Sequence, residues 1–182
     1  GPGSMGVNPY DCPEPGFYVV VYRLKPPFME QHPAGAKVIS SSIPVKPRPF
    51  ANIKSANYLF NVLMKKEAVD HGADFVLAFD ENGFLAEGPT ENAAVLGADG
   101  MLRVPKPDRI LSGTTMLRVL HLAQALVRDG ALKGTEESDI PRDQLLKAEE
   151  IFILGTTPNV TAVTEFDRQK IEIPFPHRKV IM

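Results

Sequence analysis

The sequence predicts an α+β fold with a mostly antiparallel sheet and helices packed outside it. Two consecutive hairpin patterns, in residues 75–87 and 93–104, indicate antiparallel strands, because each places a glycine-containing turn between two apolar runs. A long amphipathic pattern up to residue 129 indicates a helix with one apolar stripe. At 182 residues the chain suits one domain of ordinary to large size, or a large domain with a fragment of a second.

Composition and charge exclude several classes of function. The 20 basic and 22 acidic residues nearly cancel and form no basic tract, which argues against nucleic-acid and membrane partners. The single cysteine, Cys12, cannot form an internal disulfide, and no apolar run is long enough to cross a bilayer. We therefore expect a soluble cytoplasmic protein, and no metal site is predicted. Residues 1–4 look like the remnant of a cleaved tag and are left out of the fold prediction.

The first half of the chain predicts two strands and a helix. Residues 5–16 are proline-rich and are predicted to be a linker before the domain formed by residues 17–182. Residues 17–24 are β-branched and aromatic throughout, which predicts a strand buried on both faces. The following elements are expected to be a proline-containing loop in residues 25–36, a strand in residues 37–43 and a helix in residues 55–70 with Gly72 as its C-cap.

The second half continues the sheet. Asn82 and Gly83 supply a tight turn between strands in residues 75–79 and 84–87. Gly130 ends the long helix, which Ser112 or a threonine can cap. The remaining expected elements are strands in residues 93–96 and 101–104, a short helix in residues 142–149, and strands in residues 151–154 and 160–166. No element is assigned after residue 166.

Lys54 is the first candidate for chemistry. It ends an extended run held by Pro44, Pro47 and Pro49, and it stands just before the predicted helix. The positive end of that helix disfavours a charged ammonium, which suits an amine nucleophile that forms a Schiff base with an aldehyde cofactor. The alternative is an ordinary surface lysine that begins a helix, which is the commoner case for a lysine taken alone.

Two glycine–threonine motifs are candidate anion sites. Gly113, Thr114 and Thr115 open the long helix, where free backbone N–H groups, the helix dipole and two hydroxyls suit a phosphate monoester. Thr156 and Thr157 follow Gly155 at a strand end and offer a second group of donors. An ordinary helix cap and an ordinary turn explain each motif when it is considered alone.

Glu87 and Tyr58 complete the candidate set. A carboxylate after an apolar strand can accept a hydrogen bond from a protonated ring nitrogen of a cofactor, and the alternative is a solvated turn glutamate. Tyr58 stands four residues after Lys54. Its hydroxyl can bind a cofactor oxygen, or its ring can simply pack.

Four motifs in this order resemble the class IV, or fold type IV, pyridoxal-phosphate enzymes, which include branched-chain and D-amino-acid aminotransferases and 4-amino-4-deoxychorismate lyase. The motifs are Lys-Ser-Ala-Asn-Tyr-Leu from Lys54, Glu-Gly-Pro-Thr-Glu-Asn from Glu87, Ile-Leu-Ser-Gly-Thr-Thr up to Thr115 and Gly-Thr-Thr up to Thr157. The resemblance covers residues 17–166. It implies a sheet curled into a pseudo-barrel with outer helices, as in the C-terminal domain of these enzymes, with their N-terminal domain largely absent.

The resemblance also implies pyridoxal 5′-phosphate as cofactor and a role for each site residue. Lys54 would bind the cofactor covalently and move protons, Glu87 would pair with the pyridine nitrogen, and Tyr58 would lie near the phenolate oxygen. The other implied contacts are Leu111 on the ring, Gly113, Thr114, Thr115 and Thr156 at the phosphate, Asn92 in support of the Glu87 loop, and Thr157 beside the substrate carboxylate.

The chain departs from the family pattern in three places. Family members carry a domain before residue 17, of which residues 5–16 would be a remnant, and that domain supplies an arginine to the phosphate. They also end in a further helix, and they often have arginine where this chain has Met116. The leading hypothesis is a homodimeric aminotransferase acting on an amino acid and a 2-oxo acid. The alternatives are 4-amino-4-deoxychorismate lyase, which eliminates pyruvate, and a truncated domain without catalysis.

Overall fold

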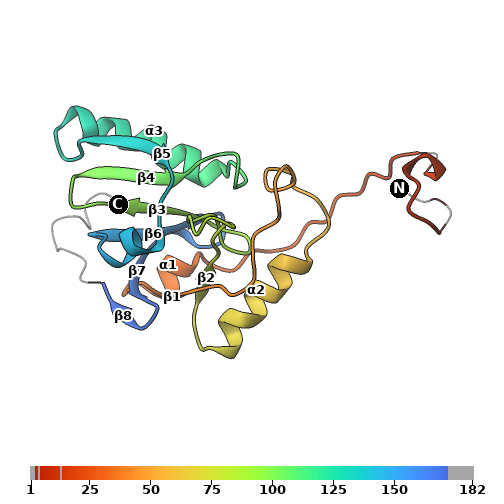
Figure 1. Cartoon of the computed structure of the whole chain (residues 1–182), viewed down its shortest axis with the longest axis horizontal. Helices are drawn as coiled ribbons and strands as arrows, with labels where there is room; N and C mark the ends of the chain where they lie inside the picture. Colours follow the sequence, from red (N-terminus) through yellow and green to blue (C-terminus); the bar gives the residue numbers. More distant parts are fainter. Residues whose placement is uncertain (1–2, 4, 13, 172–182) are drawn as a thin grey trace.

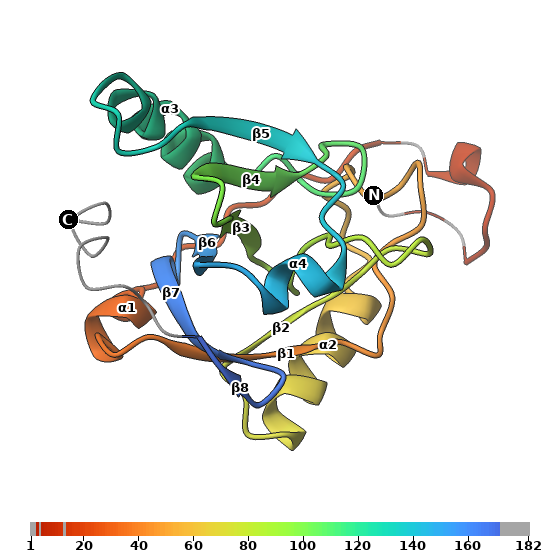
Figure 2. The same ribbon diagram turned by 60° about the vertical axis from the view of Figure 1, so that its left-hand side comes forward.

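A strongly curled mixed sheet of eight strands forms the centre of the molecule (Figures 1 and 2). The computed structural model of the chain describes residues 3, 5–12 and 14–171. The strand order is β2-β1-β7-β6-β3-β4-β5, and β8 pairs with β7. The strands are β1 (Ala36–Ser40), β2 (Phe75–Leu77), β3 (Asn92–Leu96), β4 (Met101–Pro105), β5 (Gly134–Ser138), β6 (Glu150–Gly155), β7 (Asn159–Phe166) and β8 (Gln169–Lys170).

The predicted α+β class is confirmed, but the sheet contains more parallel pairing than expected. Strands β1–β2, β1–β7 and β4–β5 are parallel, whereas β3–β4, β3–β6, β6–β7 and β7–β8 are antiparallel. Parallel neighbours need a long crossover, which is usually a helix. Helix α2 (Leu59–Asp70) lies between β1 and β2 in the chain, and α3 (Thr114–Arg128) lies between β4 and β5. The two longest helices therefore explain two of the parallel pairs.

Both predicted hairpins are present. Strands β3 and β4 pair across a turn in which Gly100 has a φ of +76°. The other hairpin turns at Gly83, with a φ of +78°. It is closed by the Phe79–Leu85 bridge and by Ala78, whose N–H donates to the Glu87 carbonyl and whose carbonyl accepts the Ala86 N–H. This second hairpin ends at Glu87, so its turn chemistry determines where that carboxylate lies.

Helix α2 begins later than the sequence suggested, whereas α3 and α4 begin where it predicted. Helix α2 starts at Leu59, with Tyr58 as N-cap, four residues later than predicted. Helix α3 has Gly113 as N-cap and no capping side chain, so the expected cap by Ser112 or a threonine is wrong. The shorter helices are η1 (Pro9–Asp11), α1 (Phe28–Gln31) and α4 (Arg142–Leu146). No helix of the described residues is long and apolar enough to span a membrane.

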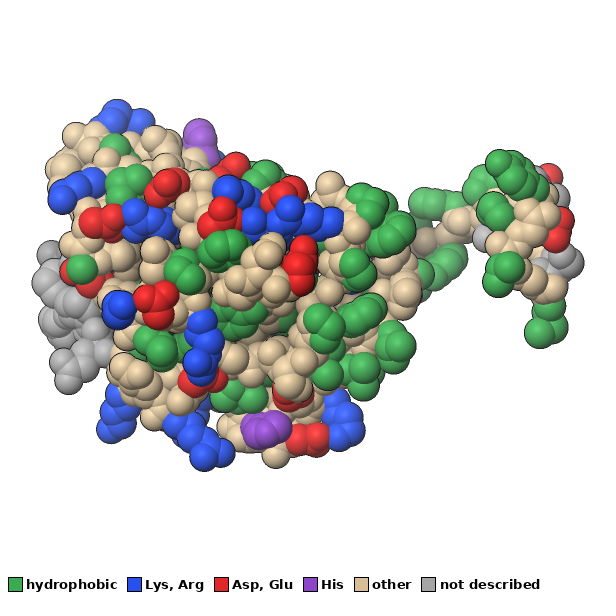
Figure 3. Space-filling model, in the orientation of Figure 1, with side chains coloured by type: hydrophobic (Ala, Val, Ile, Leu, Met, Phe, Trp, Pro, Cys, Tyr) green, Lys and Arg blue, Asp and Glu red, His purple; other side chains and the backbone are tan. Residues whose placement is uncertain are grey.

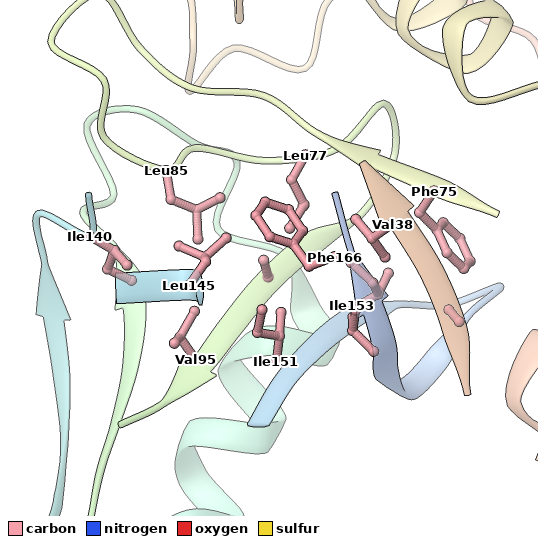
Figure 4. Close-up of a cluster of buried hydrophobic side chains, with 13 residues drawn as sticks. Val38, Phe75, Leu77, Leu85, Val95, Ile140, Leu145, Ile151, Ile153 and Phe166 are labelled. Carbon is pink, nitrogen blue, oxygen red and sulfur yellow. The ribbon is translucent and has the colours of Figure 1, made fainter. Parts of the chain in front are cut away.

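The sheet buries side chains on both faces. Along β6, Ile151 and Ile153 belong to one apolar cluster with Phe166 and Leu77, whereas Phe152 and Leu154 belong to the cluster beneath α3. Figure 4 shows the first cluster converging between the strands. This alternation is the period of two that a strand imposes on its side chains. The core therefore fixes β6 and β3, which together carry one end of the site described below.

Several segments differ from the sequence prediction. Residues 84–87 form isolated bridges and no strand, and the helix expected in residues 142–149 ends at Leu146. Residues 17–24 form no strand, and the side chains of Phe17, Tyr18 and Val21 are 91%, 83% and 88% exposed. Figure 1 shows this segment leading away from the body. A strand needs a partner for its backbone groups, and the described residues offer none to this run. Strand β5 and helix α1 were missed, because β5 is a polar edge strand and α1 is a single turn among prolines.

Candidate functional site

A cavity of about 720 Å³ lies at the end of the sheet where β3 begins and β6 ends. Its walls come from the segment before α2, the end of the second hairpin, the loop after β4, the start of α3 and the turn after β6. The structure thus brings together segments that are far apart in the sequence. The predicted site residues that line it are Lys54, Tyr58, Glu87, Asn92, Leu111, Gly113, Thr114, Thr115 and Thr156.

Lys54 offers an exposed amine in this cavity. Its Nζ donates to the Tyr58 hydroxyl at 3.2 Å. Helix α2 begins five residues after Lys54, and the field of a helix end falls off within one turn, so the expected helix-dipole effect on this lysine is wrong. A second cation is present instead, because the Nζ atoms of Lys46 and Lys54 each lie 5.9 Å from the centre of the Tyr58 ring.

Glu87 is a carboxyl group whose pKa is shifted by opposing effects. Its Oε2 accepts the Leu111 N–H at 3.0 Å and lies 3.4 Å from Asn92 Nδ2. Burial raises the pKa of Glu87 to about 7, while the Leu111 N–H and the positive charges of Lys46 and Lys54 oppose that rise. A cationic N–H group that entered the cavity would therefore stabilise the ionised carboxylate.

Asn92 holds the loop that leads to α3. Its side chain is buried, and its Nδ2 donates to the Leu111 carbonyl at 2.8 Å. A Cβ added at Gly113 would lie only 2.0 Å from Asn92 Oδ1. The N–H and C=O of Leu111 are thus bound by Glu87 and Asn92, and Gly113 must be a glycine for the backbone to approach this closely.

The start of α3 has the chemistry of an anion site. Because Gly113 provides no capping side chain, the first N–H groups of this 15-residue helix have no side-chain partner there. Thr114 and Thr115 bring hydroxyls to the same wall of the cavity, and Thr156 reaches it from the turn after β6. Uncapped N–H groups at the positive end of a helix favour a phosphate or carboxylate.

Thr157 is the one predicted site residue outside this set. Its carbonyl accepts the Phe28 N–H at 2.9 Å, and it borders a smaller hollow beside Phe28 and Asp74. Its role beside a substrate stays a prediction.

Sequence reasoning missed Lys46 and Asn61, which also line the cavity. Asn61 Nδ2 donates to the Pro89 carbonyl, and its buried Oδ1 has no hydrogen-bond partner among the described residues. Neither residue stands in a recognisable local pattern. The path of the chain around Lys54 brings both of them to the cavity.

Relatives of the chain are aminotransferases. It is 38% identical over 172 residues to D-amino-acid transaminase, chloroplastic, of Arabidopsis thaliana, covering 94% of this chain and 45% of the relative. It is 31% identical to D-alanine aminotransferase of Bacillus licheniformis, covering 86% of this chain and 60% of the relative. The chain therefore spans about half the length of the curated relatives it matches.

Solved structures of aminotransferases share the fold of this chain. The fold IV transaminase CpuTA1 of Curtobacterium pusillum superposes with a TM-score of 0.72 at 27% identity, covering 84% of this chain and 53% of that one. The branched-chain amino acid aminotransferase of Thermobaculum terrenum, solved in its PLP-form, gives a TM-score of 0.67 at 28% identity, covering 75% and 44%. Residues 1–166 match the family model described as amino-transferase class IV. The chain belongs to the class IV aminotransferase family.

Proposed function

We propose that this chain binds pyridoxal 5′-phosphate through Lys54 and moves an amino group between an amino acid and a 2-oxo acid. One observation carries the proposal, namely that an amine, a partly buried carboxyl and an uncapped helix start line the same cavity. Each group alone has an ordinary explanation. These groups come from segments up to 61 positions apart, from Lys54 to Thr115. Packing alone does not explain why all three line one cavity.

The residues present suit this cofactor at three places. The amine of Lys54 is exposed and can react with an aldehyde. The Glu87 carboxyl is fixed by Leu111 and can accept a ring N–H. The glycine backbone at residue 113, held against Asn92, leaves the helix N–H groups free for a phosphate. When bound, the cofactor supplies an aldehyde that takes up the amino group and a ring that withdraws electrons.

The proposed work of the protein side chains is to hold groups and move one proton. Lys54 Nζ is the base that takes the proton from the α-carbon of the amino acid and returns it. The Tyr58 hydroxyl accepts a hydrogen bond from this Nζ and keeps it in the cavity. The Glu87 carboxylate would hold the ring N–H, and Leu111 contributes an apolar part of the cavity wall.

A second copy of the chain is the proposed partner. Phe50, Ile53, Leu59 and Val62 are 58%, 48%, 63% and 60% exposed, and they alternate along the sequence with residues that line the cavity. Figure 3 shows hydrophobic side chains gathered on the part of the surface where α2 begins. Apolar clusters of this kind mark interaction surfaces. Dimerisation there would cover the open side of the cavity.

Single-turnover mixing tests the proposed reaction. The protein is loaded with pyridoxal 5′-phosphate and mixed separately with D-alanine, L-leucine and aminodeoxychorismate, and absorbance and pyruvate are followed. Conversion to the pyridoxamine form with either amino acid supports the proposal. No conversion with any amino acid, or pyruvate release from aminodeoxychorismate alone, contradicts it. The Lys54→Ala variant is the matched control.

A further inference from the structure

A buried ion pair lies behind the cavity wall. Arg109 Nε is 2.9 Å from Asp80 Oδ2, and the two side chains are only 6% and 2% exposed. Arg109 Nη1 also pairs with Asp139, which is bound in turn by Lys106. Both Asp80 and Arg109 lie outside the set of residues that line the cavity, so the proposed reaction does not use them.

The pair joins two segments that carry site residues. Asp80 stands in the turn of the hairpin that ends at Glu87, and its Oδ1 accepts the N–H groups of Asn82 and Phe84 at 2.9 Å. Arg109 precedes Leu111 by two residues, and its guanidinium lies 5.2 Å from the centre of the Phe84 ring. The hairpin therefore binds the loop twice, through Asp80–Arg109 at one point and through Glu87–Leu111 at the other.

A third segment is attached to the same cluster. Arg48 Nη1 lies 3.0 Å from Asp108 Oδ2, and its Nη2 lies 3.7 Å from Asp80 Oδ2. Arg48 is six residues before Lys54, in a segment that folds into consecutive turns closed by the Phe50 N–H to Pro47 and Ile53 N–H to Phe50 hydrogen bonds, so the extended run expected up to Lys54 is wrong. Its side chain is 40% exposed, so this link is weaker than the buried pair.

We propose that the Asp80–Arg109 ion pair is a positioning device that holds the loop of residues 109–113 against Glu87 and so sets the geometry of the cofactor site without touching the cofactor. The physical reason is that moving the loop away from the hairpin would separate Arg109 from Asp80 and leave each buried charge without its main counter-charge. The loop is then fixed before any ligand arrives, which lowers the cost of ordering it on binding. The effect on the cofactor site rests on the proposed function, whereas the positioning of the loop by the ion pair does not.

The test compares variants that remove the pair with and without leaving a buried charge. Arg109→Met alone leaves Asp80 buried with only the more distant and 40% exposed Arg48 as a counter-charge, and can unfold the protein. The double variant Asp80→Asn/Arg109→Met removes both charges, keeps an acceptor for Asn82 and Phe84, and leaves Asp139 with Lys106. Arg109→Lys keeps the positive charge, but its single ammonium replaces a guanidinium that reaches both Asp80 and Asp139.

The matched control is Asp99→Asn/Arg103→Met, which removes a bidentate pair with bonds of 2.9 and 2.6 Å elsewhere on the sheet.

Amide hydrogen exchange of the ligand-free protein is the first measurement. In the double variant we expect amides of residues 109–113 to exchange about tenfold faster or more, with a smaller rise in Arg109→Lys and none in the control. Exchange in β6 serves as the internal reference for the fold. Unchanged exchange in the loop overturns the proposal. An equal rise in the loop and in β6 also overturns it, because the pair would then hold the whole fold and not the loop.

Cofactor affinity is the second measurement, by absorbance titration with pyridoxal 5′-phosphate. We expect the dissociation constant to rise about tenfold in the double variant and to stay unchanged in the control. An unchanged constant with a loosened loop overturns the positioning role. If the unaltered protein binds no pyridoxal 5′-phosphate, the proposed function fails, while the exchange measurement still decides whether the pair holds the loop.

Discussion

Replacing Glu87 with glutamine should make the ligand-free protein more stable at alkaline pH while weakening its cofactor site. Burial raises the pKa of Glu87 from its ordinary value of 4.5 to about 7. A carboxyl whose pKa is raised on folding contributes stability below its unfolded pKa and loses that contribution as the pH rises through the folded pKa. Each pKa unit corresponds to about 1.4 kcal/mol, so above pH 7 the ionised carboxylate costs the folded protein about 3 kcal/mol.

Glutamine carries no charge at any pH and keeps an acceptor for the Leu111 N–H, so it avoids this cost. The free energy of unfolding of Glu87→Gln should exceed that of the parent by about 3 kcal/mol at pH 8 and by less than about 1 kcal/mol at pH 5, because the contribution is lost between the unfolded pKa of 4.5 and the folded pKa of about 7. Urea titration followed by far-ultraviolet circular dichroism measures both, since the chain has no tryptophan. Glu137→Gln, on the exposed side of β5, is the control and should change little. A difference between Glu87→Gln and the parent that is the same at both pH values, or a variant that is less stable at pH 8, would refute a raised pKa at Glu87.

Two further predictions concern the cavity walls. Gly113→Ala places a Cβ 2.0 Å from Asn92 Oδ1, so it should displace the start of α3 and raise the dissociation constant for pyridoxal 5′-phosphate about tenfold, but that for pyridoxal much less. An equal effect on both ligands, compared with the open-site control Gly6→Ala, would argue against a phosphate site there. Tyr58→Phe removes the acceptor of the Lys54 amine, and its side chain is partly exposed, so stability should change by less than about 0.5 kcal/mol while covalent binding of the cofactor slows several-fold. Unaltered binding kinetics would show that the hydroxyl does not position the amine.

Local sequence patterns predicted the elements well where a segment pairs or packs with residues close to it in the sequence. The turn at Gly83 and the turn at Gly100 depend on backbone conformations that neighbouring residues determine, and both hairpins were found. The apolar stripe of α3 likewise required only its own period. Residues 17–24 failed for the opposite reason. Their composition predicts burial, but burial needs a second surface, and the described chain leaves them exposed.

The site could be predicted in its residues but not in its electrostatics. The motifs indicated Lys54, Glu87 and the start of α3, and the structure places all three on one cavity. The position of Lys46 beside Tyr58 and the buried Asp80–Arg109 pair come from the path of the chain, and no spacing in the sequence reveals them. The start of α2 at Leu59 also removed the dipole argument for Lys54, because helix boundaries are set by packing as well as by pattern.

The most direct test of the proposed site is to ask which lysine takes the cofactor. The protein is incubated with pyridoxal 5′-phosphate, reduced with borohydride, digested and mapped by mass spectrometry. Lys46 and Lys54 lie in the same cavity and provide an internal comparison. We predict one added cofactor, attached to Lys54 and lost in Lys54→Ala but kept in Lys46→Met. Attachment to Lys46 or to scattered surface lysines, or no attachment at all, would contradict the assignment of Lys54.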